Sequence, residues 1–404
     1  MAAILSAYDL PPAAEGALDS VKVSNAAYPF YVARLRLNDL RSYASLDIAF
    51  DGRPVVISGA NGAGKTNILE ALSLLGPGRG LRGAMLPEIA RRDGAGGWAV
   101  AVMVEDRQAS CRLGTGLEPG SLRRAFRFDG LSASGPQVLA QKLPIVWLTP
   151  AQDRLFMEPG SARRKFLDRL VLGFDPAHAS RCQAYEHAMR ERMQLLCAEQ
   201  PADPDWLCVL EREMAEHGVA IAAARVEAVN RLSRFSVRVA PQGLFPRALL
   251  QLEGSLENAL SEGSAVALED NFAARLRESR GRDIKAGRAL EGPHRSDLIV
   301  HHAASGMEAR TCSTGEQKAL LIGLVLANAW MNKEETGRAP LLLLDEVAAH
   351  LDARHRAGLF DEIEALQTQT FMTGTDAQLF EAFGARAQHF VADGQGFAPA
   401  PLYM

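Results

Sequence analysis

The spacing of apolar residues along the chain changes twice. Short runs with alternating or continuous apolar positions come first and predict β-strands; they read YVARLRLNDL (31–40), LDIAF (46–50) and RPVVISG (53–59). From about residue 157 apolar residues recur at helical spacing, most clearly between 205 and 235. Strand patterns then return and alternate with helical patterns; these strands read DLIVHH (297–302), PLLLLDE (340–346) and QTFMTG (369–374).

This order predicts an α/β fold in which both ends of the chain build one domain and a mainly helical lobe is inserted between them. We place the first part of the α/β domain at residues 26–156, the lobe at 157–283 and the second part at 284–404. Residues 1–25 are rich in Ala and Pro and have little periodicity, so we expect a poorly ordered extension there.

Composition narrows the class of protein. With 48% hydrophobic and 23% charged residues over 404 positions, the chain is typical of a soluble globular protein. Its five cysteines form no CxxC pair, which favours reduced thiols and a cytoplasmic location. No run approaches the ~20 apolar residues of a bilayer span, so no membrane association is expected. The net charge of −4 limits any polyanion-binding surface to a local patch.

The sequence GANGAGKT lies between an apolar strand and an amphipathic helix and has the spacing G-x-x-x-x-G-K-[ST] of a phosphate-binding loop. Its glycines let backbone N–H groups turn toward phosphates, and the start of the next helix adds partial positive charge. We expect Lys65 to reach the β and γ phosphates and to act in catalysis, and Thr66 to hold Mg²⁺. The predicted nucleotide-binding residues are Gly59, Ala60, Asn61, Gly62, Ala63, Gly64, Lys65, Thr66 and Asn67.

The apolar run at 341–344 ends in two acids, Asp345 and Glu346. A nucleotide site needs a carboxylate on a neighbouring strand to position its metal, so Asp345 is predicted to contact Mg²⁺. Glu346 would polarise an attacking water, which favours hydrolysis over transfer to a small-molecule acceptor. A core strand that ends in solvated acids is the alternative for this pair.

A second glycine turn, CSTG at 312–315, opens the helical pattern of 314–332. Ser313 and Gly315 would form an anion site, or Ser313 would be a plain N-cap completed by Glu316. Chain order favours the anion site, because STGEQKALLIGLVLA, LLLLDE and HLDARH resemble the signature motif, Walker B motif and D-loop of ATP-binding-cassette ATPases. In those proteins the signature helix caps the γ-phosphate held by a second subunit, which implies a homodimer with ATP.

Further segments resemble the RecF family, the SMC-like recombination mediators of bacteria. They are LRSYASLDIAF (40–50), RRKFLD (163–168), EGPHRSDL (291–298) and TGTD (373–376). The resemblance covers residues 30–376 and implies an ABC/SMC-type P-loop ATPase head whose helical lobe replaces the long coiled coil of SMC proteins.

The resemblance also implies roles for single residues. It carries ATP binding onto the phosphate loop, and capping of the neighbouring subunit's nucleotide onto Ser313 and Gly315. Asp352 would lie at the dimer interface, and Thr375 stands where related ATPases carry the γ-phosphate-sensing H-loop. Gln152 would be a Q-loop residue that contacts the metal, with a solvated loop as the alternative.

The function implied by the resemblance is recombinational repair, replication and the SOS response, with weak DNA-stimulated ATP hydrolysis. The implied partners are duplex DNA, junctions of double-stranded and single-stranded DNA, RecR, RecO and indirectly RecA, in the cytoplasm at the nucleoid. An ATP-switched DNA scaffold without turnover shares every motif, while a monomeric P-loop NTPase or kinase leaves the second turn unexplained.

The residues alone offer two candidate DNA contacts. One is the stretch 79–127, with nine Arg against five acidic residues, and the other is the cluster of Arg163, Arg164 and Lys165. Solvated or intramolecularly paired arginines are the alternative for each.

Overall fold

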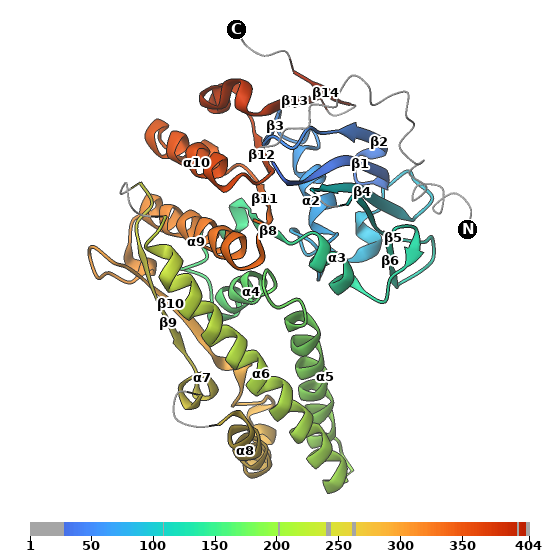
Figure 1. Ribbon diagram of the computed structural model, residues 1–404. Helices are drawn as coiled ribbons and strands as arrows, with labels where there is room; N and C mark the ends of the chain where they lie inside the picture. The colour runs from blue at the N-terminus through green and yellow to red at the C-terminus, as the bar shows by residue number, and fades with distance from the viewer. Residues whose placement is uncertain are drawn as a thin grey trace. The chain divides into compact units, whose positions relative to one another are not determined.

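The structure is a computed structural model that describes residues 28–107, 109–200, 203–239, 244–260, 264–393 and 396–400. The extension predicted at 1–25 lies outside these residues. The chain divides into two compact units: a head built from residues up to Asp153 and from Ala329 onward, and a lobe of residues Arg154–Asn328. The predicted α/β fold with an inserted, mainly helical lobe is confirmed (Figure 1).

The second boundary of the lobe differs from the expected one. Sequence analysis assigns residues 284–328 to the head, whereas they belong to the lobe. The reason is a strand pairing that crosses the expected boundary, because β10 (Asp297–His302) runs antiparallel to β9 (Ala248–Glu253) within the lobe.

The head contains an antiparallel sheet with the strand order β2-β1-β4-β5-β6-β7. Its strands are β1 (Phe30–Leu40), β2 (Tyr43–Ala49), β4 (Trp98–Asp106), β5 (Cys111–Leu117), β6 (Arg124–Phe128) and β7 (Leu131–Ser132). Alternate residues of β1, among them Leu35 and Leu37, are buried, so one face of this sheet faces the core.

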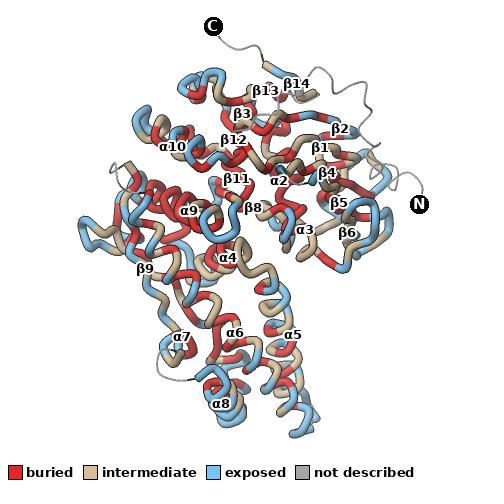
Figure 2. Tube along the Cα trace, in the orientation of Figure 1, coloured by how far each residue is buried: buried red, intermediate tan, exposed pale blue. Residues whose placement is uncertain are grey.

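The second sheet of the head has the order β14-β13-β3-β12-β11-β8. Its strands are β3 (Val55–Ser58), β8 (Ile145–Leu148), β11 (Leu341–Leu344), β12 (Thr370–Gly374), β13 (Gln388–Ala392) and β14 (Phe397–Pro399). All its neighbours pair in parallel except β13 with β14. Figure 2 shows β11 and β12 buried along their length, as expected for the centre of a parallel sheet covered on both faces.

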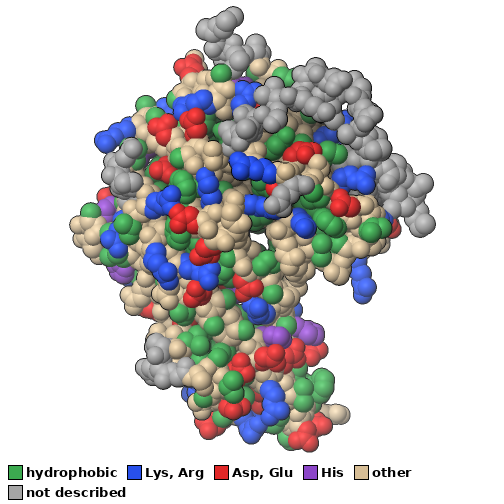
Figure 3. Space-filling model, in the orientation of Figure 1, with side chains coloured by type: hydrophobic (Ala, Val, Ile, Leu, Met, Phe, Trp, Pro, Cys, Tyr) green, Lys and Arg blue, Asp and Glu red, His purple; other side chains and the backbone are tan. Residues whose placement is uncertain are grey.

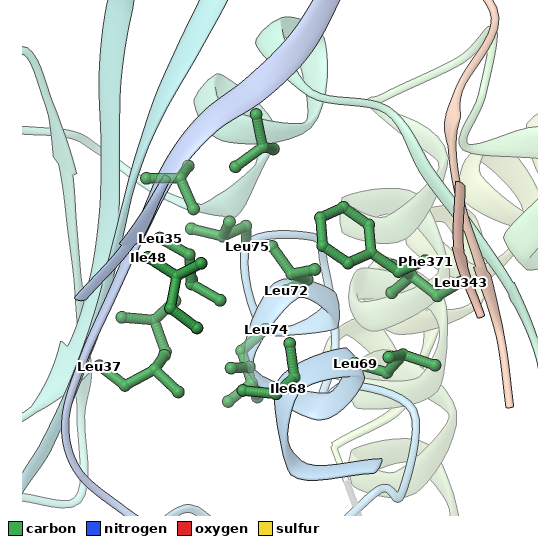
Figure 4. Close-up of a cluster of buried hydrophobic side chains, with 14 of the residues drawn as sticks. Leu35, Leu37, Ile48, Ile68, Leu69, Leu72, Leu74, Leu75, Leu343 and Phe371 are labelled. Carbon is green, nitrogen blue, oxygen red and sulfur yellow. The ribbon is translucent and has the colours of Figure 1, made fainter. Parts of the chain in front are cut away.

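Helix α2 (Lys65–Ser73) packs between the two sheets of the head. Figure 4 shows its apolar side chains, such as Ile68 and Leu72, between Leu35 of β1 on one side and Phe371 of β12 on the other, and all four side chains are fully buried. The head also contains α3 (Pro136–Lys142), α10 (Ala353–Leu366) and the short 3₁₀ helices η1 (Leu86–Ile89), η2 (Pro150–Gln152), η5 (Val347–His350) and η6 (Ala377–Arg386). The start of α2 is therefore fixed by a large shared core.

The lobe is mainly helical, with a separate apolar core around Tyr185, Met214 and Phe272. Its elements are α4 (Gly160–Val171), α5 (His178–Leu196), α6 (Pro204–Ser236), α7 (Ser255–Ala259), α8 (Ala265–Ala286), η3 (Pro293–Arg295) and η4 (Ala309–Thr311). Helix α9 (Thr314–Thr336) begins in the lobe and ends in the head. None of the helices in the described part of the chain combines the length and apolar character that a bilayer span needs.

Candidate nucleotide site

The predicted site residues of the head follow the carboxyl ends of adjacent parallel strands. The phosphate loop follows β3, Asp345 follows β11, Thr375 follows β12 and Gln152 comes shortly after β8. Pairing of β3 with β12, of β12 with β11 and of β11 with β8 brings these ends to one edge of the sheet. Ligand sites of open α/β sheets lie at such an edge.

The backbone of the phosphate loop requires glycine at several positions. Gly59, Gly62 and Gly64 have φ angles of 149°, 83° and 92°, which side chains rarely tolerate. A Cβ on Gly59 would stand 2.2 Å from the carbonyl oxygen of Ala392, and one on Gly64 would stand 2.8 Å from the Tyr43 hydroxyl. Among the described residues, no atom lies within 4 Å of a Cβ built on Gly62, so the loop has free space at its crest.

Lys65 is buried at the start of α2, and its ammonium group folds back over the loop. Its Nζ donates to the carbonyl oxygens of Gly59 and Ala60, at 2.7 and 2.9 Å. The cation is thus held beside the loop, where a P-loop lysine meets phosphate oxygens. Asn61 and Gly62 are exposed, Ala63 and Gly64 are buried, and Thr66 is partly exposed.

Two side chains donate to one oxygen of Asp345. Thr66 Oγ1 donates to Asp345 Oδ1 at 2.9 Å, and Thr373 Oγ1 donates to the same oxygen at 2.6 Å. The backbone N–H of Glu346 donates to Thr373 Oγ1 at 3.0 Å. A hydroxyl and a carboxylate oxygen in contact are the hard oxygen ligands that Mg²⁺ prefers, so Thr66 and Asp345 fit the predicted metal.

Sequence analysis missed Thr373 because it assigned the function of the TGTD segment to Thr375. Thr373 is buried in β12 next to Asp345, whereas Thr375 is exposed just beyond the strand. The neighbouring Asp376 caps η6 by accepting from the Gln378 N–H at 2.9 Å. A signal was available, since a buried hydroxyl group within a central strand needs a hydrogen-bond partner.

Glu346 has a left-handed backbone, with φ 53° and ψ 21°. This conformation costs a non-glycine residue about 1 kcal/mol or more and persists only where the surroundings enforce it. The hydrogen bond from the Glu346 N–H to Thr373 Oγ1 and the 3₁₀ helix η5 that follows hold the residue in this conformation. Strain of this kind gathers at functional positions, which agrees with the predicted role of Glu346.

The segment between β1 and β2 is attached to the phosphate loop. Asn67 Nδ2 donates to Ser42 Oγ at 2.9 Å, and Arg82 donates to Asn67 Oδ1 at 2.8 Å. The Tyr43 hydroxyl donates to the carbonyl oxygen of Gly64 at 3.3 Å. Burial raises the pKa of Tyr43 to about 12, so its hydroxyl remains a donor at neutral pH. These contacts fix the loop from outside its own motif.

Gln152 and Asp352 each cap a helix. Gln152 Oε1 accepts from the Thr149 N–H at 3.1 Å and closes the capping box of η2, so its contact with a metal stays a prediction. Asp352 is exposed and caps α10 by accepting from the His355 N–H at 2.8 Å, and its second oxygen lies 2.8 Å from His355 Nδ1. Hydrogen bonds from the His355 backbone and side chain lower the pKa of Asp352, which therefore stays ionised.

The turn at 313–316 lies in the lobe, at the start of α9. Ser313 donates both its backbone N–H and its hydroxyl to Glu316 Oε2, at 2.8 and 2.7 Å. These hydrogen bonds lower the pKa of the Glu316 carboxyl. The N-cap alternative therefore describes the turn as it stands in one chain, while exposed Ser313 and Gly315 are accessible to a second chain.

Most arginines of the two candidate DNA patches have partners within their own unit. Arg82 pairs with Glu70 and Arg91 with Asp39, both at 2.8 Å, and Arg124 donates to the carbonyl oxygens of Gly76 and Gly78. In the lobe, Arg163 forms a two-point ion pair with Asp297, at 2.8 and 2.5 Å. On the face in view in Figure 3, Lys and Arg side chains alternate with Asp and Glu. These arginines are thus paired within the protein, which is the alternative to DNA contact that the sequence left open.

Together, a phosphate loop after β3, an acidic pair after β11 and the parallel strands between them define the head of a P-loop ATPase of the ABC/SMC class. Residues 34–76 match the family described as AAA domain. An SMC head domain from Pyrococcus furiosus has a similar fold, with a TM-score of 0.51 and 17% identity over 92% of this chain and 96% of that one.

Curated relatives identify the family within this class. The DNA replication and repair protein RecF of Rhizobium johnstonii is 51% identical over 91% of this chain and 98% of its own length, and RecF of Rhizobium meliloti is 48% identical over 90% and 98%. A solved structure described as the recombination mediator protein RecF-ATPrS in the RecFOR pathway has a TM-score of 0.80 and 22% identity, over 93% of this chain and 99% of that one. The chain belongs to the RecF family of DNA replication and repair proteins, as the motifs predicted.

Proposed function

We propose that this chain is an ATP-dependent DNA-binding protein of recombinational repair and replication-fork maintenance. Two copies close on gapped or junction DNA when both nucleotide sites are filled, and slow hydrolysis reopens them. The observation that carries the proposal is the contact of Thr66 and Thr373 with Asp345 at the carboxyl edge of the parallel sheet, together with the Lys65 ammonium group held against the phosphate loop.

Each residue of the nucleotide site has a separate role in the proposed reaction. Backbone N–H groups of the loop and the Lys65 ammonium bind the phosphates, and Thr66 and Asp345 hold Mg²⁺. The metal, when bound, offsets charge on the phosphate oxygens. Thr373 fixes the orientation of Asp345, and Glu346 orients the attacking water and accepts its proton.

The dimer places a second chain's turn against this site. Ser313 and Gly315 bind the γ-phosphate of the neighbouring copy, and Asp352 lies at the interface. Thr375 and Gln152 lie at the same sheet edge as Asp345 and adjust to the nucleotide. Support for RecO and RecR as partners comes from family membership and from the solved RecF structure that is described within the RecFOR pathway, and RecA is proposed from the family resemblance of the sequence motifs.

A DNA-binding assay on purified variants tests the proposal. Fluorescence anisotropy of a labelled gapped duplex is measured with and without Mg-ATP. The Glu346→Gln protein binds nucleotide and cannot activate water, so its complex with DNA should outlast that of the wild type. Lys65→Met should lose the response to ATP. Equal DNA binding by both variants, with and without ATP, would contradict the proposal.

A scaffold that binds ATP without significant turnover is the second candidate, because binding alone can close a dimer. The left-handed backbone of Glu346 supports hydrolysis as the function, because strain of this kind is found mainly at functional positions. Steady-state phosphate release separates the two functions. We expect slow, DNA-stimulated release by the wild type that Glu346→Gln abolishes, whereas a scaffold would give equal rates for both proteins.

A further inference from the structure

The GPHR element at 292–295 has three residues with a structural role. Gly292 has φ 131°, and a Cβ there would lie 2.1 Å from the Tyr185 hydroxyl. Pro293 accepts from Arg225 at 2.6 Å through its carbonyl oxygen. His294 Nε2 bonds the carbonyl oxygen of Ala289 at 3.1 Å, so this nitrogen carries the proton and Nδ1 accepts from the Tyr185 hydroxyl at 2.7 Å.

Arg295 is different, because its exposed side chain lies at the edge of a cavity in the lobe. This cavity has a volume of about 290 Å³ and is lined by α5, by the chain after α8 and by η3. Met189 and Met193 of α5 and the buried Ala289 give it apolar walls. Arg190, Arg288 and Arg295 are exposed around it, and we call it the Arg-rimmed cavity.

The three rim arginines have no carboxylate partner within the described part of the chain, although their neighbours do. Arg192 on the same helix pairs with Glu211 at 3.0 Å, and Arg282 near the end of α8 pairs with Glu291 at 3.2 Å. Three exposed arginines without a carboxylate partner among the described residues thus lie around one apolar hollow of the lobe. Three like charges held together favour a ligand that brings negative charge.

We propose that the Arg-rimmed cavity binds an acidic peptide segment of a partner protein, with an apolar side chain of that segment seated against Met189 and Met193. Arginine forks match carboxylates in two-point contacts, and methionine side chains adapt to apolar groups of different shape. The DNA backbone has phosphates that could contact the arginines but no apolar side chain that could contact the methionines. A peptide with acidic and apolar residues would contact both. All the residues that line this cavity belong to the lobe, whereas the phosphate loop and Asp345 belong to the head.

The test uses the full chain without nucleotide and a fluorescein-labelled ten-residue peptide with acidic residues on either side of a Leu-Leu pair. Fluorescence anisotropy should detect binding that weakens as salt rises. The double variant Arg190→Glu, Arg288→Glu should weaken binding at least about tenfold, since it replaces two charge-assisted contacts by repulsion. Circular dichroism melting checks that this variant stays folded.

Arg234→Glu is the matched control. Arg234 is exposed on α6, 23 residues or about 34 Å along the helix from the Glu211 that Arg192 contacts, so peptide binding should not change. Equal weakening by Arg234→Glu would overturn the proposal in favour of general charge attraction. Equal binding of a Ser-Ser version of the peptide would overturn it by removing the apolar anchor. A double variant that loses affinity for a labelled duplex but not for the peptide would assign the cavity to nucleic acid instead.

Discussion

Thr373 connects the two acidic residues of the nucleotide site. Its hydroxyl donates to Asp345 and accepts from the backbone of Glu346, so one side chain orients both. Thr373→Val keeps the shape of the residue and removes both hydrogen bonds. Hydrogen bonds to charged groups contribute about 1.5–3 kcal/mol, so we expect ATP turnover to fall about 10- to 100-fold and the melting temperature to fall by several degrees.

Thr375→Val is the matched control for this substitution. Thr375 is exposed beyond the end of β12, and its predicted role rests on family resemblance. If Thr375→Val slows turnover as much as Thr373→Val does, the H-loop assignment of Thr375 gains support and the special role of Thr373 is wrong. Phosphate release measured at saturating Mg-ATP distinguishes these outcomes.

Asp168 is an acid of the lobe whose charge stabilises the fold. Burial alone would raise its pKa, but the hydrogen bond from His178 and the charge of Arg225 outweigh burial and hold the pKa of Asp168 at about 2. The folded pKa lies below the ordinary value near 4, so the stabilisation is complete above about pH 4 and disappears as the pH falls toward 2.

Asp168→Asn should therefore destabilise the lobe at pH 7, by about 3 kcal/mol, because Arg225 keeps a buried charge without its partner. The difference from the wild type should shrink at pH 3. Urea unfolding followed by circular dichroism at both pH values measures it. Asp47→Asn, which removes a more exposed partner of Arg34, should cost less than about 1 kcal/mol. A constant difference between pH 7 and pH 3 would contradict the assignment.

At the scale of elements, a helix or strand is best predicted from the sequence where one continuous segment contains the whole pattern of apolar residues and the motif that ends it. The apolar runs of β3, β11 and β12 end directly in glycine or acidic motifs. Both their assignment as strands and the edge of the sheet at which these motifs lie could therefore be predicted. The pairing of β9 with β10 joins residues from 44 (Glu253 with Asp297) to 54 (Ala248 with His302) positions apart, which no local pattern reports, and it moves the lobe boundary. A local pattern could flag Thr373 as a buried hydroxyl that needs a partner, but not which partner, because Asp345 follows another strand, β11.

The first turn of α9 gives a prediction about charge. Glu316 caps the helix through Ser313, and its ionised carboxylate would stand beside the γ-phosphate if this turn meets a neighbour's nucleotide. Glu316→Gln keeps an acceptor for the capping box and removes the charge. We expect the variant to hold an ATP-dependent dimer several-fold more tightly, since a like charge near a phosphate is unfavourable.

This effect is measured as the dissociation constant of the dimer with Mg-ATP. The variant Glu308→Gln, a partly buried acid of the same unit that pairs with Arg310 at 2.9 Å, is the control and should behave as the wild type does. Equal dimer strength in all three proteins would mean that the Glu316 carboxylate points away from the nucleotide.

For the whole molecule, the two predicted halves of a nucleotide site lie in different units of the chain. The phosphate loop and the acidic pair belong to the head, whereas Ser313 and Gly315 belong to the lobe. Within one chain the Ser313 hydroxyl is engaged by Glu316, and the Lys65 ammonium is engaged by carbonyl oxygens of its own loop. Each half is thus internally satisfied, and in the proposed dimer nucleotide would give both halves a shared partner.

The last prediction follows from this division. In the Glu346→Gln background, sedimentation should find single chains without nucleotide and the mass of two chains with Mg-ATP. Ser313→Arg should abolish the dimer by filling the exposed turn, whereas Ser305→Arg, an exposed serine of the same unit, should keep it. Persistence of single chains in the unmodified Glu346→Gln protein, with ATP shown to be bound, would contradict closure by nucleotide. A dimer that survives Ser313→Arg would leave closure intact and remove the 313–315 turn from the interface.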